Sequence, residues 1–231
     1  MINISNEVVS LSHISDNKLK YDKGKWKKIM DTTQSNYANM IKRLTRKSKF
    51  SNFILIYYSI FLIITTLTCK YFSDYYNVTL SEYFSIILSI VVLAYSIINN
   101  NANYSVRIHN LENSLNELKN LKRELDQADL KKCVDKYNDI TDKTERREDI
   151  DFFKTVRSLA KLYDVNILTK KVKKGCKDID REKVDVVLGY LSEISVSMAI
   201  TKIAIEYLWY IIVVCIPIIM FVVCIIARGV L

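Results

Sequence analysis

The sequence is poor in the residues that punctuate β-rich and loop-rich folds. It has one proline, Pro217, and four glycines among 231 residues, and tight turns and strand breaks depend largely on these two residue types. It has two histidines, and it contains no HExxH, GxGxxG, GxxxxGK(S/T) or GxSxG motif. Zinc hydrolysis, nucleotide binding and serine hydrolysis through those motifs are therefore excluded. We expect no enzyme activity, no metal and no cofactor.

The cysteines also lack the spacing of metal ligands. None of the five belongs to a CxxC pair, and two lie within the last apolar stretch. They are predicted to be reduced, structural or lipid-facing thiols rather than metal ligands or a disulfide framework. The five are Cys69, Cys133, Cys176, Cys215 and Cys224.

Long stretches almost free of charge are present instead. A helix of about 20 residues rises about 30 Å, which is the thickness of the hydrocarbon core of a bilayer. A buried helix of a soluble protein is usually shorter and carries a polar stripe. We therefore predict an all-α membrane protein, with a transmembrane hairpin, a third C-terminal span and long helices that extend into a cytoplasmic helical bundle. The predicted spans are residues 50–69, 80–98 and 206–227.

The distribution of positive charge predicts the orientation. Five basic residues lie within residues 42–49, whereas the link at residues 70–79 holds only two charged residues, Lys70 and Asp74. Cytoplasmic flanks carry the excess of Lys and Arg, so we expect a cytoplasmic N-terminus and an external hairpin loop. The third span then leaves the C-terminus outside the membrane. Because much of the formal charge of +9 adjoins a span, we expect lipid contact and no direct nucleic-acid binding.

The segment at residues 99–205 is predicted to form the cytoplasmic bundle. No proline or glycine interrupts residues 80–130, so we expect one long helix that leaves the membrane as a coiled-coil-like stalk. Lys122 occupies a position where its heptad calls for an apolar side chain. The heptad residues are Ile108, Leu111, Leu115, Leu118 and Leu125.

Further helices are predicted on either side of the stalk. An amphipathic helix is expected around residues 151–168, after an acidic cluster at residues 148–151 that is expected to be solvated. A second stalk begins near Arg181, capped by Asp178 or Asp180, and runs into the third span without a break. Residues 1–24 are expected to be disordered or weakly ordered. A basic amphipathic helix at 25–49 either lies on the inner leaflet or packs against the bundle.

Polar residues in and beside the second span suggest a water-filled path. Small hydroxyl residues line pores, but they also let helices approach closely, and both interpretations stay open. Pro217 is a candidate hinge of the third span. In the first span, Tyr57 and Tyr58 lie too deep to belong to an aromatic belt. The candidate pore-lining residues are Ser85, Ser89, Ser96, Asn99, Asn100 and Asn103.

The segment at residues 93–125, LAYSIINNNANYSVRIHNLENSLNELKNLKREL, carries a Tyr, an Arg and a His before a leucine-spaced polar helix. These residues are Tyr104, Arg107 and His109. With the basic lead-in and the close hairpin, the segment resembles the SLATT family of bacterial conflict systems over residues 25–130. Some SLATT subfamilies carry a further C-terminal span.

The resemblance implies a membrane effector of antiphage immunity. Such an effector assembles into a homo-oligomer, forms a pore or disrupts the inner membrane, and arrests growth or kills the cell when a partner sensor signals infection. The partners it implies are a nucleotide-second-messenger synthase or a reverse transcriptase encoded nearby. The alternative is a scaffold or signalling protein without a pore, whose cytoplasmic helices recruit a soluble partner.

Overall fold

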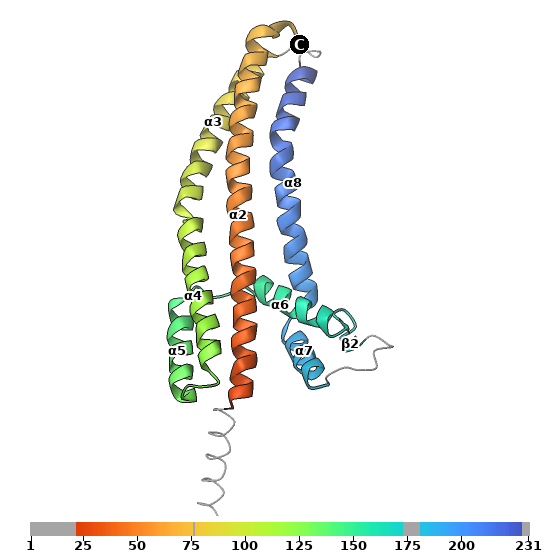
Figure 1. The fold of residues 1–231 in the computed structure, drawn as a ribbon. Coiled ribbons are helices and arrows are strands. Elements are labelled where there is room, and N and C mark those ends of the chain that lie inside the picture. The colour runs from red at the N-terminus through yellow and green to blue at the C-terminus, as the bar shows by residue number, and fades with distance from the viewer. Residues whose placement is uncertain (1–21, 76, 173–180, 228–231) are drawn as a thin grey trace, which may run out of the picture. The chain divides into compact units, whose positions relative to one another are not determined.

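The computed structural model describes residues 22–75, 77–172 and 181–227 (Figure 1). It is almost entirely helical, which confirms the predicted all-α class. The elements are α2 (Lys23–Tyr71), η1 (Ser73–Tyr75), α3 (Val78–Asn101), α4 (Tyr104–Glu124), α5 (Leu130–Lys143), α6 (Asp149–Leu162), β1 (Val165–Asn166), β2 (Lys171–Val172), α7 (Arg181–Glu193) and α8 (Val196–Ile226).

The chain divides into two compact units. The spanning unit comprises residues 43–107 and, from 191 onward, the C-terminal part of the chain; the bundle unit comprises residues up to 42 together with 108–190. Among the residues that the structure describes, three helices are long and apolar enough to cross a membrane, and only 11% of the most apolar window of α8 is buried. Apolar surface of this extent on α2, α3 and α8 suits lipid rather than water.

The predicted lead-in and first span form one continuous helix, α2. Within the bundle unit, Met30 of α2 is fully buried against Leu121 of α4 and Leu125, which directly follows α4. Of the two alternatives for the lead-in, the structure therefore shows packing against the bundle. α2 begins at Lys23, and residues 1–21 of the segment expected to be weakly ordered lie outside the described residues.

The prediction of a single long helix across residues 80–130 is wrong, because the helix is interrupted twice. α3 ends at Asn101, and Asn103 adopts the left-handed region with φ 47° before α4 begins. Asparagine tolerates this region because its short side chain bonds locally; here the Asn103 amide donates to the Asn101 carbonyl at 3.3 Å. The second break precedes α5, where the Asp129 carboxylate accepts from the Lys131 N–H at 3.2 Å.

The prediction that the second stalk runs into the third span without a break is also wrong. α7 is described from Arg181, near the predicted start, but it ends at Glu193, and α8 starts afresh with Ser195 as its extended N-cap residue. Serine favours this position, and its carbonyl accepts the Ala199 N–H at 3.1 Å. The proposed caps Asp178 and Asp180 lie outside the described residues.

The amphipathic helix expected at residues 151–168 is shorter than predicted. α6 ends at Leu162, and β1 and β2 form an antiparallel pair that the sequence did not suggest. The acidic cluster is not simply solvated, because Asp151 is fully buried. Its carboxylate accepts the Glu148 N–H at 3.2 Å, half of a capping box that satisfies the start of α6.

Three polar contacts supplement the core of the bundle unit. Lys122, which interrupts the predicted heptad, forms an ion pair with Asp31 of α2. Thr155 of α6 donates to the Asn36 amide oxygen at 2.8 Å, and the Asn39 amide donates to Thr155 at 2.9 Å. These side chains tie α2 to α4 and α6 beside the apolar core of Met30, Leu121, Leu125, Leu130, Cys133 and Val134.

Candidate functional site in the spanning unit

Pro217 lies inside α8 and deprives one carbonyl of its usual donor. Proline has no N–H, so the carbonyl four residues earlier, that of Val213, loses its intrahelical hydrogen bond. The Tyr58 hydroxyl of α2 donates to that carbonyl at 2.7 Å, and the Tyr57 hydroxyl donates to the next carbonyl, of Val214, at 3.0 Å. The candidate hinge is therefore bonded across to α2.

This contact explains why two tyrosines lie deep in the first span. An unsatisfied carbonyl in hydrocarbon costs several kcal/mol, and prolines in spanning helices are tolerated where a neighbouring helix supplies a donor. Tyr58 is only 5% exposed, and its hydroxyl supplies the donor that the Val213 carbonyl lacks. The sequence held a sign of this pairing, namely a proline and two tyrosines at mid-span depth, but it did not reveal the register that joins them.

A charged cluster joins α2 and α8 near the end of the spans where residues 42–49 lie. The Arg46 Nη2 atom donates to both Glu206 carboxylate oxygens, at 3.3 and 3.4 Å. The Tyr210 hydroxyl donates to the same carboxylate at 2.6 Å, and Arg46 Nη1 donates to the Tyr207 hydroxyl at 3.2 Å. Since the Glu206 side chain is 17% exposed, this carboxylate depends on its partners for charge compensation.

α3 is held by contacts at both of its ends. The Ser51 hydroxyl of α2 donates to the Tyr95 hydroxyl at 3.0 Å, and the Asn99 amide donates to the Asn52 side-chain oxygen at 3.1 Å. At the other end, the Asn77 N–H donates to the Cys224 carbonyl of α8 at 3.2 Å. Polar bonds therefore connect the three spanning helices near both ends and at mid-depth.

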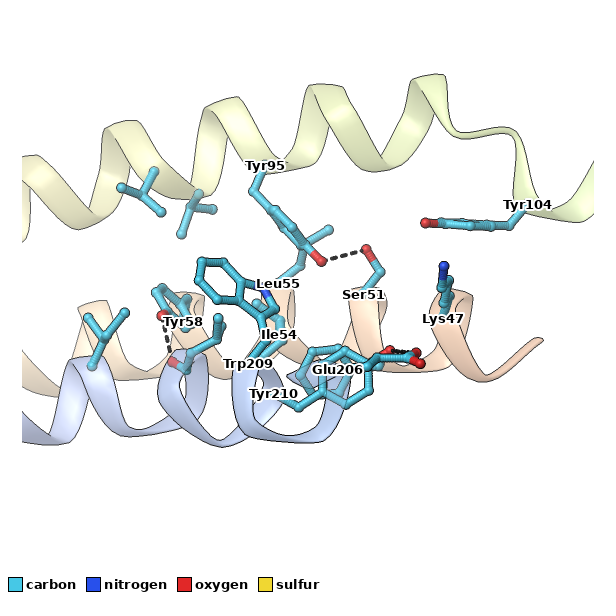
Figure 2. Close-up of a pocket in the computed structure, with 15 residues that line it drawn as sticks. Lys47, Ser51, Ile54, Leu55, Tyr58, Tyr95, Tyr104, Glu206, Trp209 and Tyr210 are labelled. Carbon is cyan, nitrogen blue, oxygen red and sulfur yellow. Dashed lines mark hydrogen bonds between the residues drawn. The ribbon is translucent and has the colours of Figure 1, made fainter. Parts of the chain in front are cut away.

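These helices line an open-sided cavity of about 540 Å³ (Figure 2). Its polar end is lined by Lys47, Glu206 and Tyr104, the first residue of α4. Ser51 and Tyr95 follow along the wall, and the deeper part is apolar. Figure 2 shows Tyr95 and Tyr104 on one side of the cavity, across from side chains of α2 and α8.

The candidate pore residues do not share one environment. Ser85 and Asn99 are partly buried, near the packing side of α3 that contains Ser81 and Leu88, whereas Ser89, Ser96, Asn100 and Asn103 are exposed. The Ser89 hydroxyl donates to the Ile86 carbonyl of its own helix at 2.7 Å. A hydroxyl satisfied in this way is tolerated beside lipid or water alike, so the pore-lining role stays a prediction.

The three residues of the predicted family motif take part in different contacts. Tyr104 lines the cavity of the spanning unit. The Arg107 N–H donates to the Asn103 carbonyl at 3.1 Å and so helps to start α4. His109 is exposed, and its Nε2 atom lies 3.2 Å from the Asn113 amide one turn further along α4.

The structure also bears on the cysteines. Cys69, Cys133, Cys215 and Cys224 are free thiols, and Cys176 lies outside the described residues. Among the residues that the structure describes, no group of three or more His, Cys, Asp or Glu side chains could hold a metal ion.

The fold and these contacts agree with a comparison against protein families. Residues 19–227 match SLATT_5, described as the SMODS and SLOG-associating 2TM effector domain family 5. The matched residues include α8, so the third apolar helix belongs to the family region although the description names two spans. No curated protein and no solved structure matches the chain. The chain belongs to the SLATT_5 family of SMODS and SLOG-associating transmembrane effector domains.

Proposed function

We propose that this protein is a pore-forming effector of a bacterial antiphage system. Copies of the chain assemble in the inner membrane and permeabilise it when a partner sensor signals infection. The observation that carries this proposal is the exposure of Ser89, Ser96 and Asn100 on α3, a helix whose surface is otherwise largely apolar and exposed. In an oligomer, these polar side chains would face a shared water-filled path instead of lipid.

The mechanism is a switch between two packings of the spans. In the resting packing, the Arg46–Glu206–Tyr210 cluster and the Tyr58–Val213 bond hold α8 against α2. A signal received by the bundle unit favours a packing in which these bonds are exchanged and α3 turns toward its copies.

The family description names association with SMODS and SLOG, and it supports a proposal that the effector has a partner encoded nearby. A nucleotide-second-messenger synthase or a reverse transcriptase encoded nearby would supply the signal. In the proposed topology the N-terminus and the bundle unit are cytoplasmic, where such a partner is present, and the C-terminus is outside. The bundle unit receives a protein or a messenger and does not bind nucleic acid directly.

A membrane-potential dye tests the pore. The full chain is expressed with its genomic neighbours, the system is triggered, and dye signal and growth are followed together. Depolarisation should accompany growth arrest and should weaken in Ser89→Val. Ser59→Val is the matched control, because Ser59 is also exposed and donates to a carbonyl of its own helix, that of Leu55 at 2.8 Å. Growth arrest with intact potential would instead support the scaffold alternative.

The resting packing has a test of its own. Glu206→Gln removes the charge that Arg46 binds, and a loss of about 1 kcal/mol shifts a two-state equilibrium roughly fivefold. We expect resting dye leakage from vesicles that contain the variant to rise by about that factor. Glu82→Gln, at an exposed position of α3, should leave leakage unchanged. Equal leakage from both variants would refute the locking role of the cluster.

A further inference from the structure

We propose that the cavity between α2, α3 and α8 binds one anionic phospholipid, with its phosphate at Lys47 and an acyl chain along the apolar wall. The volume of about 540 Å³ lies within the range of small-molecule sites, roughly 300–1,000 Å³. The proposal is independent of pore formation, because it concerns the resting protein.

The polarity of the lining changes with depth, as it does along a lipid. Lys47 lies just before the uncharged stretch of α2, at the level of the headgroups. Ile54 lines the same cavity seven residues later, which is about 10 Å deeper at 1.5 Å per residue. Val92 and Val213 continue the apolar wall from α3 and α8. A cationic end and an apolar body match a charged headgroup and its chain.

The charges at the polar end favour an anion. Arg46 and Glu206 form an ion pair with one another. The charge of Lys47 is therefore not compensated by Glu206. Lys47 forms no ion pair with another residue in the described part of the chain. The side chain therefore supplies one positive charge at the mouth of an apolar cavity.

A second polar group also faces the cavity without a protein acceptor. Ser51 donates to the Tyr95 hydroxyl oxygen, so the hydrogen of the Tyr95 hydroxyl remains to be donated. No acceptor for it occurs among the residues described in the structure. A hydroxyl at the boundary between headgroup and chain is placed to donate to a lipid ester carbonyl. The cation of Lys47 and the donor of Tyr95 below it match the phosphate and the ester carbonyl of a glycerophospholipid.

Trp209 provides a direct probe, because it lines the cavity and the chain has only two tryptophans. Full-length Trp26→Phe protein is reconstituted in phosphatidylcholine vesicles that contain a small fraction of brominated phosphatidylglycerol or the same fraction of brominated phosphatidylcholine. We expect quenching of Trp209 to be roughly fivefold more effective with the anionic lipid, which corresponds to about 1 kcal/mol for one lysine.

The matched variants separate a site from general surface charge. Lys47→Met should remove the preference, whereas Lys49→Met, an exposed residue on the same helix that does not line the cavity, should keep it. Absence of a preference in the parent protein, or equal losses in both variants, would overturn the proposal. Native mass spectrometry of the chain with Trp26 intact should retain one phosphatidylglycerol per protomer, and retention unaffected by Lys47→Met would likewise overturn it.

Discussion

Replacing Tyr58 with phenylalanine removes the hydroxyl that donates to the Val213 carbonyl at 2.7 Å. Pro217 has already removed the intrahelical donor of that carbonyl, and with Tyr58 only 5% exposed, water has little access to replace it. A buried unsatisfied group costs about 1–3 kcal/mol, and measured interhelical bonds in membranes reach about 1.7 kcal/mol. We therefore expect Tyr58→Phe to lower the free energy of unfolding by about 1–2 kcal/mol.

The explanation requires this loss to depend on Pro217. Pro217→Ala restores an N–H four residues after Val213, so the carbonyl regains its donor within α8. In that background, Tyr58→Phe should cost only about 0.5 kcal/mol or less, which leaves a coupling of roughly 1 kcal/mol between the two sites.

The cycle is measured by unfolding the full chain in mixed micelles as the fraction of sodium dodecyl sulfate rises, with far-ultraviolet circular dichroism as the readout. Tyr57→Phe is the matched control. Its acceptor, Val214, keeps the Ile218 N–H of the regular helix, so its cost should be smaller and equal in both backgrounds. If Tyr58→Phe costs the same with proline or alanine at position 217, the pairing argument is wrong.

Three further predictions concern the bundle unit. Thr155→Val deprives the buried Asn36 amide of its 2.8 Å bond and should lower the free energy of unfolding by about 1–3 kcal/mol, measured by thermal circular dichroism. Burial raises the pKa of Tyr37 above its ordinary value of 10.0. The contribution of the protonated side chain to the free energy of unfolding is complete below pH 10 and is lost as the pH rises through the raised pKa. Tyr37→Phe should therefore lessen the fall in stability above pH 10. Lys122→Met removes a partly exposed ion pair with Asp31 and should change stability by less than about 1 kcal/mol, since an apolar side chain suits that heptad position.

The sequence was sufficient for the properties that neighbouring residues determine together. Hydropathy over about 20 residues identifies a span before any contact is known, and the three helices of the structure agree with that prediction. The helix beginning near Arg181 was predicted from two possible capping residues, Asp178 and Asp180, and the structure describes α7 from Arg181 onward. The family resemblance also rested on local features, a close hairpin followed by a polar helix, and the match over residues 19–227 confirms it.

Breaks between helices were harder to predict because they required no glycine or proline. Asn103 enters the left-handed region, and Ser195 acts as an N-cap. Asparagine and serine also occur in unbroken helices, where their side chains bond outward or back to the helix. Composition alone therefore does not distinguish a kinked stalk from a straight one.

The pairings that define the site depended on register between distant segments. Tyr58 and Val213 are 155 residues apart, and Arg46 and Glu206 are 160 residues apart. The sequence by itself determined that three helices are apolar enough to span a membrane, because that property is a sum over adjacent side chains. Only the tertiary structure decided that Tyr58 serves the carbonyl freed by Pro217 and that Lys47 opens onto an apolar cavity, because hydrogen bonds and cavities depend on which faces of separate helices meet.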